Sequence, residues 1–315
     1  AAAARGADGE AGEGGPVDLV VWAHFHASGG KETCRWAFVA EKNAKVSGLR
    51  LDGMQKATAA CNQIDPGVPA EWHAARVHTC ADMRRFCRNH GGSSWMFVET
   101  ALDVRPKCPR MAFVTIIRHP WLRLQSTQGK LGWLFPNASA VIRRMQFGDD
   151  PLSEASGWNY CPVRHAPVCQ PFFGAGYFNN YFIRYLLGSD EGAHVPWGHI
   201  GETHFWKAKA ILEDFDLVIP IDHLADALPA LQCAVGGLYD LGADGTPGGR
   251  YGWTQARRKT GPGADECGRE STNYHERTRR ELCLLFQEHN QWDRKLWEWA
   301  KDRWERRQAG RCWSG

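Results

Sequence analysis

Short runs of apolar residues alternate along this chain with segments that carry apolar residues at helical spacing. The apolar runs lie at residues 17–23, 94–99, 111–117 and 217–221. The helical segments lie at residues 31–41, 71–90, 121–130, 178–187, 204–215 and 276–307, the last as one long helix or a broken pair. Strands that alternate with helices are typical of doubly wound parallel sheets. The pattern therefore predicts an α/β fold.

The length and charge of the chain limit its organisation. Its 315 residues, 43% of them hydrophobic, suffice for one large domain, which we place at residues 16–310. Residues 1–15 are rich in Ala, Gly and Glu and predict a flexible stem or linker, and residues 236–268 predict a long loop. The net charge of +3 comes from 38 basic and 35 acidic residues mixed along the chain. We therefore expect no nucleic-acid partner, and any anion site must be local.

Eleven cysteines occur, and their spacing contains neither a C-x-x-C pair nor the paired clusters that a tetrahedral zinc site requires. Disulfides in an oxidising compartment fit this number better, and an odd total leaves at least one cysteine outside them. Cys161 and Cys169 bracket a short loop that a disulfide could close, although the sequence alone assigns no pairing. The longest early apolar run is far shorter than the roughly 20 residues that cross a bilayer.

A polar loop with two glycines, H-F-H-A-S-G-G-K-E-T at residues 24–33, separates the first predicted strand from the first predicted helix. Backbone N–H groups at a helix start carry partial positive charge, and glycines let a phosphate approach them closely. Lys31 and Thr33 would add a cation and a hydroxyl. An ordinary glycine-rich turn before a helix explains the same letters, so this loop needs a second signal.

The second signal is R-H-P-W-L-R-L-Q-S at residues 118–126, directly after the third predicted strand. Arg118 then lies at the carboxyl edge of the sheet, where open α/β folds bind ligands. Pro120 suits the first turn of the helix that follows. Arg123 and Ser126 lie on that helix, so that a guanidinium and a hydroxyl could turn toward a phosphate. The alternative is a solvated arginine on a helix face.

Together and in this order, the two motifs resemble those of sulfotransferases that use 3′-phosphoadenosine 5′-phosphosulfate (PAPS), especially Golgi carbohydrate enzymes of the 2-O-like and algal or plant type. In that family H-x-H-K-[ST]-G-G-T binds the 5′-phosphosulfate and R-x-P-x-x-R-x-x-S grips the 3′-phosphate. The second motif fits letter for letter. The resemblance implies a P-loop-like sheet and the following donor-binding residues: His26, Ala27, Ser28, Gly29, Gly30, Lys31, Glu32, Thr33, Arg118 and Ser126.

Two further segments are similar to those of algal and plant relatives. Residues 180–188 follow N-x-x-x-R-x-L-x-G, and residues 290–297 follow N-x-x-D-x-x-L-[YW], which extends the resemblance over about residues 17–307. Their apolar members are more often core than site, so a purely structural role is the alternative.

The family's loop lysine falls at Ala27 here, and the family's threonine falls at Lys31. A lysine directly after the last loop glycine has the placement of the phosphate-binding lysine in nucleotide P-loops. We therefore expect Lys31 to support the leaving phosphate. We expect the basic cluster Arg257, Arg258 and Lys259 to cover the donor phosphates, with a solvated charge run as the alternative.

The resemblance implies an in-line transfer of the sulfuryl group to a hydroxyl, with adenosine 3′,5′-bisphosphate as product and no metal. Glu99 ends the second predicted strand at the same sheet edge and is our first candidate for the catalytic base. His78 is the alternative, because some relatives use a histidine from this part of the chain. His24 and His26 form an H-x-H pair without a third ligand at zinc spacing, so we expect them to shape the loop.

The acceptor expected from the resemblance is a glycan or glycoprotein, and the expected location is the Golgi lumen, as the ectodomain of a single-pass membrane protein whose anchor is absent from this chain. A protein-tyrosine sulfotransferase and a non-catalytic glycan-binding relative remain open, the latter because of Ala27. A P-loop kinase is a further alternative. Its G-x-x-x-x-G-K-[ST] pattern is not met, because Glu32 occupies the Ser/Thr position and Phe25 the first glycine position.

Overall fold

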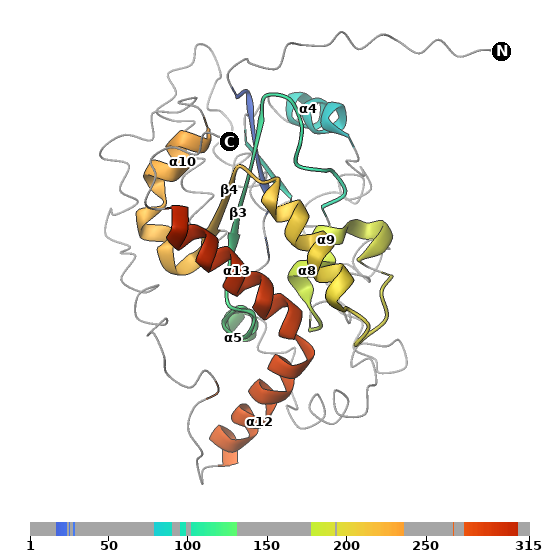
Figure 1. Cartoon of the computed structure of the whole chain (residues 1–315), viewed down its shortest axis with the longest axis vertical. Helices are drawn as coiled ribbons and strands as arrows, with labels where there is room; N and C mark the ends of the chain where they lie inside the picture. The colour runs from blue at the N-terminus through green and yellow to red at the C-terminus, as the bar shows by residue number, and fades with distance from the viewer. Residues whose placement is uncertain are drawn as a thin grey trace, which may run out of the picture.

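The computed structural model describes residues 17–23, 25, 28, 79–89, 95–98, 102–130, 178–192, 194–235, 267 and 274–307. The strands of this part are β1 (Leu19–Ala23), β2 (Trp95–Val98), β3 (Met111–Ile117) and β4 (Leu217–Pro220). Its helices are α4 (Cys80–Asn89), α5 (Pro120–Lys130), α8 (Tyr181–Glu191), α9 (Glu202–Glu213), η3 (Ile221–Asp226), α10 (Leu228–Ala234), α12 (Tyr274–His289) and α13 (Gln291–Arg307) (Figure 1). Predictions for residues 1–16, 31–78 and 236–266 fall outside the described residues.

The strands form a parallel four-stranded sheet in the order β2-β1-β3-β4. Ala23 at the end of β1 pairs with Val98 at the end of β2 and with Thr115 in β3. Because every pairing is parallel, the carboxyl ends of the strands meet at one edge of the sheet. The predicted α/β class with a parallel sheet is confirmed.

Helices cover both faces of this sheet, so its strands are buried on both sides. Leu19, Val21 and Ala23 of β1 belong to one core cluster, which is shared with α4, α5, α8, α9 and α12. Val20 and Trp22 point the other way and join the cluster formed with η3, α10 and the end of α13. Figure 1 shows α13 running across the front of β3, with α9 beside the strands. A strand buried on both faces explains the continuous apolar runs in the sequence.

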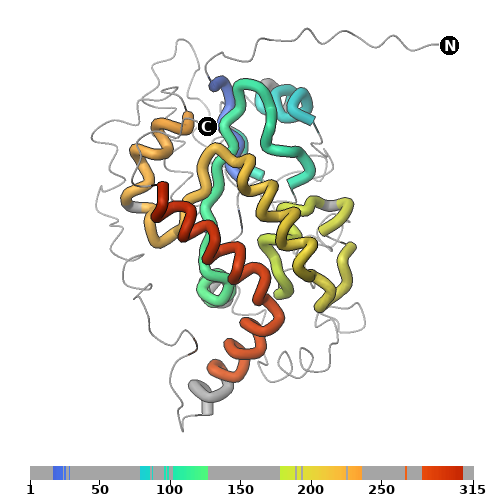
Figure 2. The backbone as a smooth tube through the Cα atoms, in the orientation of Figure 1, coloured from blue at the N-terminus to red at the C-terminus, as the bar shows by residue number. Residues whose placement is uncertain are grey.

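Helix boundaries follow local chemistry and differ slightly from the predicted segments. Helix α5 begins at Pro120, whose missing N–H is no loss in a first turn. Helix α8 begins at Tyr181 and not at residue 178, because Asn180 has a left-handed backbone with φ of 50°. The predicted segment 276–307 is a broken pair: α12 and α13 meet at a turn on Asn290 (Figure 2).

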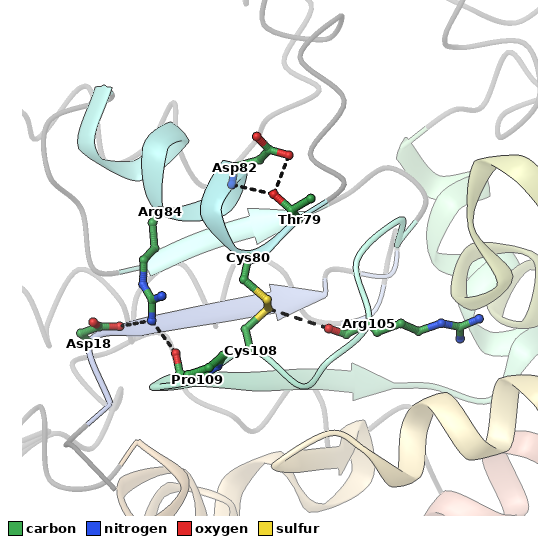
Figure 3. Close-up of a disulfide and its surroundings, with 8 residues drawn as sticks. All are labelled: Asp18, Thr79, Cys80, Asp82, Arg84, Arg105, Cys108 and Pro109. Carbon is green, nitrogen blue, oxygen red and sulfur yellow. Dashed lines mark hydrogen bonds and ion pairs between the residues drawn. A yellow bond between two sulfur atoms is a disulfide. The ribbon is translucent and has the colours of Figure 1, made fainter. Parts of the chain in front are cut away.

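The start of α4 corrects the prediction of a helix that runs through residue 79. Thr79 lies outside the helix and caps it, because its hydroxyl accepts a hydrogen bond from the Asp82 backbone N–H at 3.1 Å. The same hydroxyl donates to the Asp82 carboxylate at 2.8 Å. This reciprocal cap fixes the first turn of α4, which carries Cys80 (Figure 3).

Disulfides, predicted from the number of cysteines, join Cys80 to Cys108 and Cys267 to Cys283. Cys80 begins α4, and Cys108 lies just before β3, so this bridge joins the start of α4 to the segment that leads into β3 (Figure 3). Arg84 of α4 adds hydrogen bonds to the Asp18 carboxylate at 3.4 Å and to the Pro109 carbonyl. Cys161 and Cys169 lie outside the described residues.

Replacing Cys80 and Cys108 together with alanine is expected to lower the free energy of unfolding by about 3 kcal/mol, because the bridge closes a loop with a sequence separation of 28 residues. Urea unfolding measures this loss. A loss below about 1 kcal/mol would contradict a stabilising role for this bridge.

Candidate functional site

The strand order brings the two phosphate-type motifs to neighbouring positions. β1 and β3 are adjacent, while β2 and β4 lie on their outer sides. The strand order therefore reverses between β1 and β3, and open α/β folds bind ligands at the carboxyl edge beside such a switch point. Phe25 and Ser28 follow β1 at this edge, and Arg118 directly follows β3 there.

Two residues of the β1 loop are described, Phe25 and Ser28. Phe25 is buried, and its ring packs at centroid distances of 4.7 Å from Phe182 and 4.8 Å from Tyr185. The Ser28 N–H donates to the Phe25 carbonyl at 3.1 Å, and this bond turns the chain away from the strand. These contacts anchor the start of the loop on α8.

The Ser28 hydroxyl is buried, with 1% of the residue exposed, and finds no hydrogen-bond partner among the described residues. Leaving a buried hydroxyl unsatisfied costs about 1–3 kcal/mol, so such a group needs a reason. A ligand oxygen at the carboxyl edge would satisfy it. The neighbouring members of the predicted set lie outside the described residues: His26, Ala27, Gly29, Gly30, Lys31, Glu32 and Thr33.

Two residues of the second motif are half-buried: Arg118, which directly follows β3, and Ser126, which lies on α5. Between them, His119 is 3% exposed, and its ring meets the Trp297 indole edge-on at 4.8 Å. The Arg123 N–H donates to the His119 carbonyl at 2.9 Å and so closes the first turn of α5. The half-burial leaves the Arg118 and Ser126 side chains partly accessible to a ligand.

Arg123, the second arginine of this motif, has a different environment from the one the sequence allowed. It is fully buried, and its guanidinium carbon lies 4.3 Å above the centre of the Tyr181 ring. Phe182 provides a second ring at 5.8 Å. The described surroundings of the Arg123 cation are these aromatic rings, and a turn toward a phosphate stays a prediction.

The two family-like segments at 180–188 and 290–297 contact each other, and their polar residues hold the start of α8. The Asp293 carboxylate accepts hydrogen bonds from the N–H groups of Phe182 at 2.9 Å and Ile183 at 3.0 Å. The Asn290 side-chain oxygen accepts from the Asn180 N–H at 2.7 Å. Asp293 thus acts as an N-cap supplied by another helix, which supports the structural alternative for these segments.

Arg184 is likewise a structural arginine, 3% exposed. Its guanidinium donates to backbone carbonyls around it, namely those of Asn179, Gly192, Val195 and Pro196. It also donates to the Asn179 side-chain oxygen at 2.8 Å. These bonds tie the loop after α8 to the turn before it.

Burial raises the pKa of Asp293 to about 6, against the lowering effects of its two backbone hydrogen bonds and the charges of Arg123 and Arg184. The folded protein therefore holds this proton more tightly than the unfolded chain does, whose carboxyl has the ordinary value of 3.8. The stabilising contribution of the protonated form is complete below about pH 4 and is lost as the pH rises through about 6.

An Asp293→Asn variant removes this titration. The difference in free energy of unfolding, wild type minus variant, should therefore fall by about 2 kcal/mol between about pH 4 and about pH 7. Urea unfolding of both proteins across this pH range gives the difference directly. A difference that is constant with pH would show that Asp293 keeps an ordinary pKa in the fold.

The candidate bases Glu99 and His78 lie outside the described residues, as do Arg257, Arg258 and Lys259. The residues on either side of the Glu99 segment are described. The Tyr185 hydroxyl donates to the Val98 carbonyl at the end of β2, and the Leu102 N–H donates to the Tyr185 carbonyl at 2.9 Å. Tyr185 was not predicted from sequence, where it reads as one apolar position of a helix.

The role of the Thr115 hydroxyl was also not predicted from the sequence. Its hydroxyl donates to the Ala23 carbonyl at 2.6 Å, and this bond joins β3 to the end of β1 next to the candidate site. A threonine within the apolar run M-A-F-V-T-I-I was the available signal.

Within the described residues, no group of three or more His, Cys, Asp or Glu side chains is placed to hold a metal ion. None of the described helices combines the length and apolar character that a membrane span needs. Comparison of the chain with protein-family models, with curated proteins and with solved structures finds no match.

Proposed function

We propose that this protein is a sulfotransferase that moves the sulfuryl group of PAPS to a hydroxyl of a carbohydrate. The observation that carries the proposal is the adjacency of β1 and β3, because the chain after β1, described at Phe25 and Ser28, and Arg118 after β3 both leave the sheet at its carboxyl edge. A donor with phosphates at both its 5′ and 3′ positions needs two anion sites, and two adjacent strand ends can provide one each. The buried Ser28 hydroxyl adds an unsatisfied donor on the loop side.

In this proposal the loop amides, Ser28 and Lys31 hold the 5′-phosphosulfate, and Arg118 and Ser126 hold the 3′-phosphate. Arg257, Arg258 and Lys259 cover the donor from the later loop. Lys31 offsets the charge that develops on the phosphate oxygen as the bond to sulfur breaks. Glu99, or alternatively His78, takes the proton of the acceptor hydroxyl as its oxygen bonds to sulfur. A well-placed base contributes about two to four orders of magnitude in rate.

The proposal is tested by transfer of labelled sulfate from PAPS to a panel of glycans, with tyrosine peptides and ATP-dependent phosphorylation assayed in parallel. We expect labelled glycan and release of adenosine 3′,5′-bisphosphate, which Glu99→Gln should reduce by about a hundredfold or more. Label on tyrosine peptides alone would reassign the acceptor. Phosphate transfer from ATP, or no transfer together with no PAPS binding, would overturn the proposal.

A further inference from the structure

Arg123, the second arginine of the 118–126 motif, lies in sequence between the proposed donor-binding residues Arg118 and Ser126. Unlike them, it is fully buried. Arg123 is 0% exposed, whereas Arg118 and Ser126 are half-buried. A buried charge is costly unless other groups compensate it. The groups that compensate the charge of Arg123 therefore show which elements this arginine joins.

Arg123 joins α5 to two other helices. Its guanidinium carbon stacks 4.3 Å above the Tyr181 ring at the start of α8, and its charge acts on the Asp293 carboxylate of α13. The charged groups that face Asp293 are Arg123 from α5 and Arg184 from α8. Asp293 in turn binds the N–H groups of Phe182 and Ile183. Arg123 therefore lies where α5, α8 and α13 meet.

A second contact fixes the same turn of α5 to the same face of α13. His119 packs edge-on against Trp297, and its carbonyl accepts the Arg123 N–H at 2.9 Å. Asp293 and Trp297 are four residues apart on α13, so they share one face of that helix. The hydrogen bond that opens α5 joins His119 to Arg123, and both of these side chains pack against other helices. These two contacts set the orientation of the first turn of α5.

We propose that Arg123 is a positioning residue for the 3′-phosphate, which it orders by locking the start of α5 against the rings of Tyr181 and Phe182 so that Arg118 and Ser126 converge on one phosphate. This inference rests on the proposed function. Arg123 does not touch the donor. Hydrogen bonds weaken steeply when distance or angle departs from the optimum, so a small shift of α5 reduces the affinity for the 3′-phosphate specifically.

The test compares the affinities for adenosine 3′,5′-bisphosphate and adenosine 5′-phosphate, which differ only in the 3′-phosphate. Calorimetric titrations use the folded full chain as wild type, Arg123→Met and Arg123→Lys. We expect the preference for the bisphosphate to fall about tenfold in Arg123→Met and to recover partly in Arg123→Lys, because lysine keeps the cation over the ring but loses the planar geometry.

Arg303→Met is the matched control. Arg303 is also a buried arginine, lies 5.2 Å from the Trp299 ring and donates to the Leu212 carbonyl at 2.9 Å, but it is ten residues after Asp293 on α13. Ten helical residues span about 15 Å. Its replacement should lower the melting temperature without altering the preference for the bisphosphate.

The outcomes separate this inference from the proposed function. If wild type prefers the bisphosphate but Arg123→Met keeps that preference, or if Arg303→Met loses it equally, Arg123 has no positioning role. If wild type binds neither nucleotide, or binds both equally, the proposed donor site is wrong and the inference is wrong with it.

Discussion

Replacing Arg184 with methionine is expected to lower the free energy of unfolding by about 4 kcal/mol. The methionine side chain fills a similar volume, but the carbonyls of Asn179, Gly192, Val195 and Pro196 lose their charged donor in a buried position. Each unsatisfied buried acceptor costs about 1–3 kcal/mol, and partial access of water to the outer ones limits the total. Urea unfolding followed by tryptophan fluorescence measures the effect.

Arg294→Met is the control for this substitution. Arg294 lies on α13, is 43% exposed and pairs with Glu298 one turn later at 2.9 Å. An exposed pair of this kind contributes about 0.5 kcal/mol, so the control should unfold close to wild type. Equal and small effects of the two substitutions would show that Arg184 does not hold the loop after α8.

Replacing Arg118 with methionine is expected to weaken the binding of adenosine 3′,5′-bisphosphate by about a hundredfold, while the affinity for adenosine 5′-phosphate stays within about threefold. A guanidinium that grips a phosphate through paired charge-assisted hydrogen bonds contributes about 2–3 kcal/mol, and 1.4 kcal/mol corresponds to a factor of ten. Titration calorimetry with both nucleotides separates the loss of the 3′-phosphate contact from a general loss of binding.

Arg110→Met provides the matched control, because Arg110 precedes β3 at the amino edge as Arg118 follows it at the carboxyl edge. Arg110 pairs with Asp18 at 3.5 Å and is exposed. Its replacement should leave both affinities unchanged. A hundredfold loss for both nucleotides in Arg118→Met, or for the control as well, would argue against a 3′-phosphate contact at Arg118.

The strands were the most predictable part of this fold. β3 (Met111–Ile117) matches its apolar run at both ends. A strand buried on both faces is apolar at nearly every position, so its first and last residues can be read from the sequence. The start of α8 was less predictable. A left-handed Asn180 ends the turn there, and the residues that stabilise this turn, Asn290 and Asp293, are over a hundred residues away in sequence.

The candidate site was predictable as an edge of the sheet and not as a set of contacts. Arg118 follows β3 at the carboxyl edge, as its place after the third predicted strand indicated. The strand order that sets β1 next to β3 was not predicted. The burial of Arg123 did not follow, because the rings of Tyr181 and Phe182 reach it from a helix far along the chain. Tertiary contacts of this kind leave no periodic signal in a single sequence. Cys80 and Cys108 illustrate the same limit, since eleven cysteines allow many pairings.

The most direct test of the proposed donor site is a calorimetric titration of the wild-type protein with adenosine 3′,5′-bisphosphate, set against adenosine 5′-phosphate under the same conditions. We expect one site per chain and a preference of about a hundredfold for the bisphosphate, since only this nucleotide engages both strand ends. Equal affinity for the two nucleotides, or no binding of the bisphosphate, would contradict a donor site shared by the loop after β1 and Arg118.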